Sequence, residues 1–224
     1  THDDALAGKS PDMPDHHAAQ VMFRKRWRGV LRKPMTAVSQ FIAKQLRLQL
    51  DLDVDRVINN GVDTSTWKPG LGPKSQRYCK LIIHGVNDRA NMNKGWDHIF
   101  LLKEQLRDVA TVMSLDEYSQ LIGRPKSEAL AQADLVVHPS GFEGNSLFVA
   151  ESLACGVPVI GYDVGYLWGV TGELGTVIDR RSRAPMFTLS AVRDLMANQL
   201  LMERSGAIGR SLAPQPRWVL EGWP

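Results

Sequence analysis

Short apolar runs that end in proline or glycine dominate the pattern between residues 133 and 165. One run covers residues 135–137 and ends at Pro139, and a second covers residues 157–160 and ends at Gly161. Runs of this length, without alternating polar positions, are typical of strands that are buried on both faces. The pattern therefore predicts two strands of a parallel sheet.

The residues between these two strands are predicted to form a helix. Residues 147–155 are good helix formers on balance, Ser146 or Asn145 can cap the beginning, and Gly156 ends it. Almost every side of this helix is apolar, so Glu151 would lie where a carboxylate loses its water. A buried acid needs a partner.

The rest of the chain continues this alternation of strands and helices. Before residue 68 the pattern predicts a strand at 35–39, a helix capped by Ser39 with Ile42, Leu46 and Leu50 on one side, and a second strand that leads into a turn at Asn60 and Gly61. Residues 68–75, rich in proline and glycine, are the best candidate for a linker. The later elements are predicted as a strand at 78–84, a helix at about 93–107, a strand at 109–113, a helix at about 124–132, the unit described above, a weak strand near 176–178 and a helix at 188–204. This order predicts an α/β fold with a Rossmann-like parallel sheet, helices on both of its faces, and a partial α/β segment before it.

Loops that follow parallel strands meet at the carboxyl edge of the sheet, where open α/β folds bind their ligands. The polar groups expected there are Arg89, Lys94, Glu143, the amides of Asn145 and Ser146, and Asp163. Cations that face a helix N-terminus make an anion site, and phosphate is its common occupant. Neighbouring carboxylates can accept hydrogen bonds from sugar hydroxyls. The sequence therefore predicts a pocket for a sugar nucleotide.

Three spacings make this prediction more specific. Seven residues separate Glu143 from Glu151, Arg89 precedes the pair Lys94-Gly95 by the pattern Arg-x4-Lys-Gly, and residues 58–63 read Ile-x-Asn-Gly-Val-Asp. At these positions the chain resembles the C-terminal half of the family 4 glycosyltransferases of the GT-B fold. The likeness runs from about residue 35 to about residue 203.

The resemblance implies a role for each matching residue. It places Arg89 and Lys94 on the donor diphosphate, Glu143 at the transferred sugar and Glu151 on the ribose. The first three would form the catalytic set. The donor loop would also include Gly144, Asn145, Ser146 and Leu147, and His2 resembles the histidine on the acceptor side. The resemblance further implies transfer that needs no metal or other cofactor and retains the anomeric configuration.

The chain departs from the family pattern in the loops around the sugar. Asn145 and Ser146 stand where family members usually carry a second glycine, and the glycine pair after the next strand is here Gly165 and Tyr166. The donor sugar and its base are therefore not predicted. The glycine-rich loop that opens the first GT-B domain has no counterpart, so we expect the chain to begin midway through an N-terminal domain whose remainder is a partner in cis or in trans. We expect residues 1–68 to be the remnant of that acceptor domain, 69–205 the donor-binding domain and 206–224 a crossover segment.

Composition adds little to this interpretation. The 224 residues are 43% hydrophobic and 23% charged with a net charge of +3, which is ordinary for a globular protein and too weak to indicate a polyanionic partner. No apolar run approaches a membrane span, so a cytoplasmic protein is expected. The basic run from Arg24 to Lys33 could contact a membrane surface or a polyanion. Cys79 and Cys155 lack a metal or redox spacing, and packing is their expected role.

Three functions remain open from the sequence. The first is a glycosyltransferase that moves a sugar from a nucleotide diphosphate to the hydroxyl of an unknown acceptor. The second is a non-catalytic or truncated module that only binds the nucleotide sugar. The third keeps the GT-B fold for a nucleotide-sugar epimerase or a phosphorylase, although no acid and base pair or free phosphate site can be identified for either.

Overall fold

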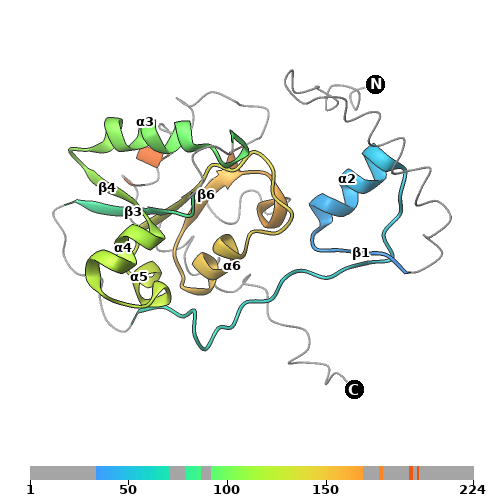
Figure 1. Ribbon diagram of the computed structural model, residues 1–224, viewed down its shortest axis with the longest axis horizontal. Coiled ribbons are helices and arrows are strands. Elements are labelled where there is room, and N and C mark those ends of the chain that lie inside the picture. Colours follow the sequence, from blue (N-terminus) through green and yellow to red (C-terminus); the bar gives the residue numbers. More distant parts are fainter. Residues whose placement is uncertain are drawn as a thin grey trace.

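The computed structural model describes residues 34–70, 79–86, 92–168, 177–178, 192–193 and 196 (Figure 1). Two parallel sheets lie within this part of the chain. The larger one has five strands in the order β4-β3-β5-β6-β7. The strands are β3 (Lys80–His84), β4 (Ala110–Ser114), β5 (Leu135–His138), β6 (Val159–Tyr162) and β7 (Val177–Ile178). The predicted parallel sheet is thus confirmed, including its weak last strand.

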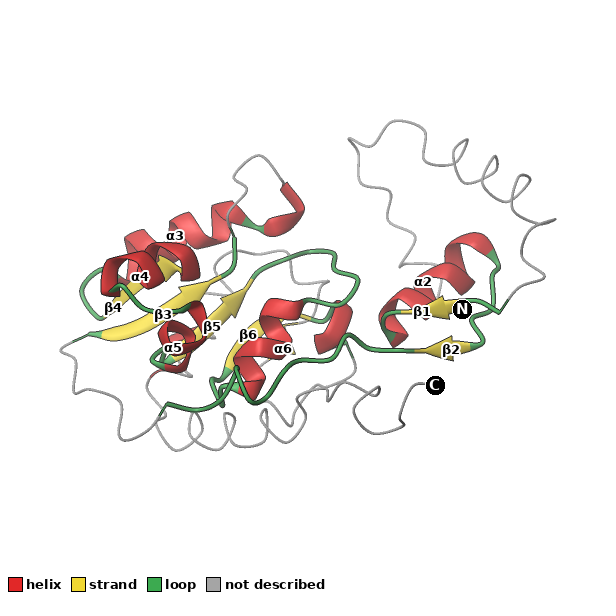
Figure 2. Ribbon diagram, turned by 60° about the horizontal axis from the view of Figure 1, so that its bottom comes forward, coloured by secondary structure: helices red, strands yellow, loops and turns green. Residues whose placement is uncertain are grey.

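Helices cover both faces of this sheet, as predicted. Figures 1 and 2 show α3 on one face and α4, α5 and α6 on the other. Their bounds are Trp96–Leu106 for α3, Leu115–Ile122 for α4, Lys126–Ala131 for α5 and Leu147–Ala154 for α6. The short 3₁₀ helices η2 (Met92–Lys94) and η3 (Gly165–Leu167) follow β3 and β6.

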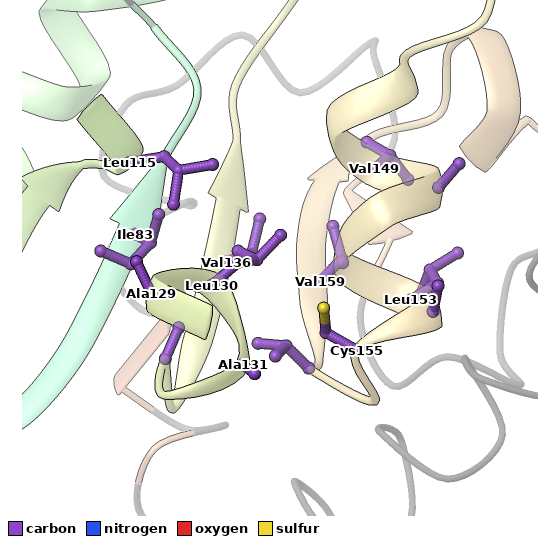
Figure 3. Packing of buried hydrophobic residues seen from close by; sticks show 14 of the residues in the cluster. Ile83, Leu115, Ala129, Leu130, Ala131, Val136, Val149, Leu153, Cys155 and Val159 are labelled. Atoms are coloured by element: carbon purple, nitrogen blue, oxygen red, sulfur yellow. The ribbon is translucent and has the colours of Figure 1, made fainter. Parts of the chain in front are cut away.

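Alternation along the strands explains the two-layered core. In β3, Leu81 and Ile83 belong to the apolar cluster under α4, α5 and α6, whereas Ile82 belongs to the cluster under α3. All three side chains are at most 3% exposed. Figure 3 shows the first cluster, in which α6 packs on β5 and β6. Strands buried on both faces explain why the sequence shows unbroken apolar runs.

A smaller unit precedes this domain. It contains β1 (Thr36–Ala37), α2 (Gln40–Leu50) and β2 (Arg56–Val57), and β1 pairs with β2 in parallel. The predicted cap is confirmed because the Ser39 hydroxyl accepts a hydrogen bond from the Ile42 amide at 3.2 Å. Within the helix Phe41 is the buried residue, and the predicted apolar side at 42, 46 and 50 is only half-buried.

The structure differs from the prediction at two helices. Residues 115–122 form a helix that the sequence analysis did not anticipate, because strand β4 runs directly into α4 at Ser114. The helix expected at 93–107 is divided by Gly95, whose φ of +69° separates η2 from α3. Of the helix expected at 188–204, only residues 192–193 and 196 are described, and these are helical.

Candidate donor-binding site

The strand order creates a crevice at one point of the sheet. Strand β3 is the first strand of the five-stranded sheet along the chain and has β4 on one side and β5 on the other. Helix α3 and the α4–α5 pair cross opposite faces of this sheet. The loops that follow the neighbouring strands β3 and β5 diverge, and open α/β folds bind ligands in the crevice between such loops. A cavity of about 300 Å³ lies at this position. It is lined by Asn60, Gly85, Val86, Lys94, His138, Ser140, Glu143, Asn145, Ser146, Leu147 and Phe148.

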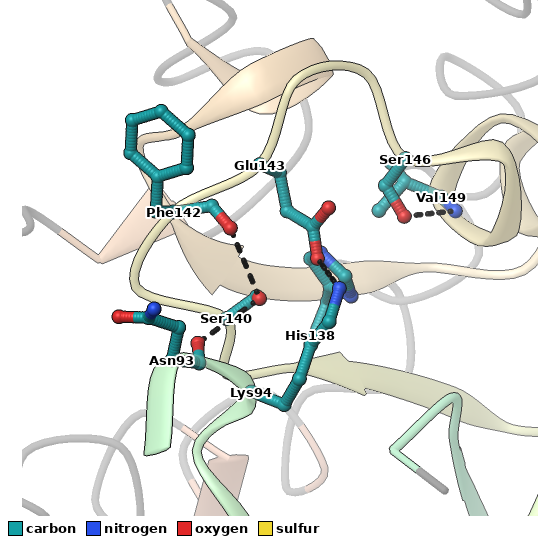
Figure 4. A network of polar contacts seen from close by, with 8 residues as sticks. All are labelled: Asn93, Lys94, His138, Ser140, Phe142, Glu143, Ser146 and Val149. Carbon is teal, nitrogen blue, oxygen red and sulfur yellow. Dashed lines mark hydrogen bonds and ion pairs between the residues drawn. The ribbon is translucent and has the colours of Figure 1, made fainter. Parts of the chain in front are cut away.

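The cavity holds an ion pair between the two loops. Lys94, at the end of η2, donates from Nζ to Oε1 of Glu143 at 2.5 Å (Figure 4). The Glu143 side chain is 14% exposed and that of Lys94 is 38% exposed. Burial raises the pKa of Glu143, but the hydrogen bonds from Lys94 and Ser140, together with the charges of His138 and Lys94, outweigh burial and hold the pKa below its ordinary value. Glu143 is therefore ionised at neutral pH.

A histidine that the sequence analysis did not select lies beside this pair. His138 ends β5 and is 6% exposed, and its Nε2 is 3.7 Å from Glu143 Oε1. This distance is too long for a hydrogen bond, and Nε2 has no partner within the described part of the chain. Burial lowers the pKa of His138 to about 4, so the imidazole is neutral at physiological pH. No signal in the sequence selects it, because a histidine at the end of a buried apolar run reads as part of the strand.

The beginning of α6 forms another wall of the cavity. Ser146 caps the helix, its hydroxyl accepting from the Val149 amide at 3.4 Å, so the sequence prediction of a cap at 145 or 146 is resolved in favour of Ser146. The first intrahelical bond runs from the Ala150 amide to the Ser146 carbonyl. Leu147 and Phe148, whose amides precede that bond, are among the residues that line the cavity. A helix N-terminus in this position attracts an anion.

Glycines bring the loops into contact around Glu143. A Cβ on Gly95 would lie 2.4 Å from the Pro139 carbonyl oxygen, and one on Gly165 would lie 2.9 Å from Cβ of Glu143. Both residues have a positive φ, which residues other than glycine rarely adopt. The loop after β3 is also bonded to the loop after β5, since the Gly141 amide and the Ser140 hydroxyl both donate to the Asn93 carbonyl. These contacts hold the loop that carries Lys94 against the loop that carries Glu143.

Asn145 links the cavity to the smaller unit. Its Nδ2 donates to the Val38 carbonyl at 2.6 Å and lies 3.3 Å from Oδ1 of Asn59. The Ser39 hydroxyl also donates to the Gly144 carbonyl at 2.5 Å. The loop after β5 is thus held on one side by η2 and on the other by the segment between β1 and α2.

The remaining predicted site residues lie in different places. Glu151, one turn along α6, is not among the residues that line the cavity, and burial raises its pKa to about 7 although the charge of Lys126 opposes the shift. Asp163 follows β6 and is also not part of the lining. Arg89, His2 and the basic run from Arg24 to Lys33 lie outside the described residues.

The described residues hold no group of three or more His, Cys, Asp or Glu that could bind a metal ion. The same part of the chain contains no helix that is long and apolar enough to cross a membrane. Cys155 is buried in the cluster between α6 and the sheet, in agreement with a packing role, and Cys79 is half-buried.

Solved structures share this fold. Sucrose-phosphate synthase from Thermosynechococcus elongatus superposes with a TM-score of 0.69 at 17% identity, over 94% of this chain and 60% of that one. Anabaena HepE, solved with UDP and glucose, gives 0.61 at 18% identity over 92% and 67%. WaaG, a glycosyltransferase involved in lipopolysaccharide biosynthesis, gives 0.64 at 16% identity over 86% and 64%. This chain therefore spans roughly two thirds or less of the length of these proteins.

No curated protein sequence matches the chain. A family model does, over residues 70–198, which is more than half of the chain and includes the whole five-stranded sheet. The model describes the glycosyl transferases group 1. The resemblance to family 4 glycosyltransferases of the GT-B fold, which rested on the two glutamates, the Arg-x4-Lys-Gly pattern and the Ile-x-Asn-Gly-Val-Asp element, is thereby confirmed. This chain belongs to the glycosyl transferases group 1.

Proposed function

We propose that the chain is the donor-binding part of a glycosyltransferase that moves a sugar from a nucleotide diphosphate sugar to an acceptor hydroxyl. The observation that carries the proposal is the convergence of the Lys94 ammonium, the Glu143 carboxylate and the beginning of α6 on one cavity. Membership in the glycosyltransferase family agrees with it. HepE, a protein of similar fold, was solved with UDP and glucose.

The diphosphate would bind between Lys94 and the first amides of α6. Both groups favour negative charge, and a lysine and a helix N-terminus are common partners of phosphate. During transfer the bond between the sugar and the diphosphate breaks, and charge accumulates on the leaving diphosphate. Positive groups that already lie in a partly buried cavity stabilise such developing charge. Arg89 is proposed as a second cation on the diphosphate from its place in the family motif.

The two glutamates are proposed to serve different ends of the donor. Glu143 lies in the cavity beside Lys94, where it can accept hydrogen bonds from hydroxyls of the transferred sugar. Glu151 lies further along α6 and is proposed to accept from the ribose. Removing a hydrogen bond between a carboxylate and a hydroxyl of the donor is expected to weaken donor binding by about 1 to 3 kcal/mol.

Affinities of the Glu143→Gln and Glu151→Gln variants test this division. Glu151→Gln is expected to weaken binding of the nucleoside and of the nucleotide sugar alike, by about 1 to 3 kcal/mol. Glu143→Gln is expected to spare the nucleoside diphosphate and to weaken only the nucleotide sugar. The opposite pattern would reverse the two roles.

We further propose that donor binding needs no metal ion and that transfer retains the anomeric configuration. The positive field of Lys94 and α6 supports the first point, because it supplies the charge that a bound cation would otherwise provide. Isothermal calorimetry with UDP and GDP, with and without a chelator, is expected to give the same affinity in both conditions. Strict dependence on magnesium or manganese would overturn metal independence, whereas no binding of any nucleoside diphosphate would overturn the function. The configuration of the product is measured by NMR of its anomeric proton.

A further inference from the structure

Oxygen Oε1 of Glu143 has two potential hydrogen-bond donors, of which only one is engaged. The engaged donor is Nζ of Lys94, which lies 2.5 Å from this oxygen and donates a hydrogen bond to it. Nε2 of His138 lies 3.7 Å from the same oxygen and is buried without a partner among the described residues. A buried polar atom without a partner is costly, so its persistence beside a carboxylate calls for an explanation.

The fold holds the imidazole firmly at this place. His138 ends β5, and its ring lies 6.3 Å from the ring of Phe148 at the beginning of α6. The backbone on either side is fixed as well, because Pro139 is pressed against Gly95 and the His138 carbonyl lies 2.6 Å from where a Cβ of Gly161 would be. The ring is neutral, and the neighbouring carboxylate favours the tautomer with its proton on Nε2.

Lys94 is not fixed in the same way. Its side chain is 38% exposed and reaches the cavity, whereas that of His138 is 8% exposed. A diphosphate carries more negative charge than a single carboxylate, so it attracts the ammonium more strongly at the same distance. If Lys94 moves toward the diphosphate, Oε1 of Glu143 loses the hydrogen bond from Lys94, and the Ser140 hydroxyl is the donor that remains when the sugar binds.

We propose that His138 is a positioning residue that donates a hydrogen bond from Nε2 to Glu143 when the donor diphosphate draws Lys94 away. The proposal rests on the proposed function, since it requires a nucleotide sugar in the cavity. Shortening the 3.7 Å distance between His138 Nε2 and Glu143 Oε1 to hydrogen-bond length needs a shift of about 1 Å at most, which a rotation of the Glu143 side chain can supply. Glu143 would remain oriented toward the sugar, and the unpartnered Nε2 would gain its acceptor.

Two substitutions separate this role from packing. His138→Leu keeps a side chain of moderate size and removes the donor, whereas His138→Gln keeps an amide donor near the position of Nε2. The measured quantity is the ratio of the affinity for UDP-glucose to that for UDP, or for GDP-mannose to that for GDP, whichever pair binds the unchanged protein. We expect His138→Leu to lower this ratio about tenfold, the loss typical of a hydrogen bond to a charged group, and His138→Gln to restore most of it.

A spectroscopic measurement on the unchanged chain provides a second readout that does not depend on a variant folding. With ¹⁵N-labelled histidine, the Nε2 proton of His138, assigned by its absence in His138→Gln, is expected to shift downfield when the nucleotide sugar is added. An unchanged ratio in a folded His138→Leu, an equal loss in both variants, or an unchanged Nε2 signal at saturation would each overturn the role of His138. A protein that binds no nucleotide at all would instead overturn the proposed function.

Discussion

At the scale of single residues, charge compensation sets the state of the cavity. Lys94 and Glu143 neutralise each other across two loops, and both are partly withdrawn from water. Removing one member of such a pair leaves the other without its partner, so the effect of a substitution includes that cost. Binding experiments on single variants therefore need a control in which a similar charge is lost elsewhere.

Replacing Lys94 with alanine is expected to weaken nucleoside diphosphate binding by about 1.5 to 3 kcal/mol, because a hydrogen bond to a charged group is lost. Binding of the bare nucleoside should change little. Lys80→Ala provides the control, since Lys80 begins the same strand, β3, at the edge opposite the cavity. Calorimetry on both variants measures the difference. Equal losses for nucleoside and nucleoside diphosphate would place Lys94 away from the phosphates.

The raised pKa of Glu151 predicts how the free energy of unfolding depends on pH. Its pKa rises from an ordinary value of 4.5 to about 7, mainly because burial disfavours the charged form. Between these two pH values the folded chain holds a proton that the unfolded chain releases. The stabilisation that this proton provides is complete below pH 4.5 and is lost as pH rises through 7. Glu151→Gln should therefore increase stability at pH 8 by on the order of 1 kcal/mol, after allowance for partial exposure, and change it little at pH 4.

Urea unfolding of the ligand-free protein at pH 4 and pH 8 measures this effect. Glu104→Gln, on the exposed side of α3, makes the same change of charge without burial and should show no such dependence. A gain of equal size at both pH values would show that ionisation of Glu151 is not its source.

The sequence was sufficient for those site residues whose position follows from the strand pattern. Lys94, Glu143 and Ser146 each lie in a loop that follows a buried apolar run, so their convergence could be predicted from the parallel sheet. His138 could not be selected in this way, because a histidine at the end of a strand reads as part of the strand. Whether its side chain points to the cavity depends on the register of β5, which the sequence leaves open.

At the scale of elements, the missed helix and the divided helix have separate causes. Ser114 ends β4 and also caps α4 through a capping box with Glu117, so no loop marks the change from strand to helix. The Ser-x-x-Glu spacing was present in the sequence and would have indicated the helix. The break at Gly95 has a different origin, since it depends on contact with Pro139, a residue far away in the sequence.

Gly95 and Gly123 form a matched pair for testing that contact. Both have positive φ, but a Cβ on Gly123 would meet nothing within 4 Å, whereas one on Gly95 would meet the Pro139 carbonyl oxygen at 2.4 Å. Gly123→Ala should cost only the backbone strain of about 1 to 2 kcal/mol. Gly95→Ala should cost about 1 to 3 kcal/mol more and weaken nucleotide binding, because the clash separates the two loops of the cavity. If urea unfolding gives equal losses of unfolding free energy for the two variants, the two loops can move apart without cost and the contact with Pro139 does not stabilise the fold.

At the scale of the whole molecule, the small unit and the five-stranded sheet meet at the loop after β5. Asn145 and Ser39 make the hydrogen bonds between them, and a Cβ on Gly144 would lie 3.5 Å from the Val38 side chain. The orientation of the Asn145 amide follows from chemistry, because a backbone carbonyl can only accept and so must face the nitrogen. The two units are therefore coupled through the same loop that carries Glu143.

Asn145→Ala is expected to loosen the small unit without unfolding the sheet. Hydrogen exchange of amides in α2 should accelerate several-fold or more, since a hydrogen bond contributes about 1 kcal/mol, while amides of β3 and β5 should be unaffected. Leu48→Ala, on the exposed side of α2, is the control. Equal acceleration in α2 and the sheet would indicate general destabilisation, and none in α2 would show that Asn145 does not hold the unit.

The pairing of β3 with β5 has a consequence for the order in which the protein folds. Ile82 pairs with Leu135, and η2, α3, β4, α4 and α5 lie between them in the chain, whereas β3 and β4 are joined through η2 and α3 alone. Closing the longer loop costs more entropy, so contacts between distant segments form later. We expect the unit of β3, α3 and β4 to assemble first and the crevice beside β3 to close only when β5 arrives. A nucleotide would then stabilise the finished sheet, but it could not guide the earlier steps of folding.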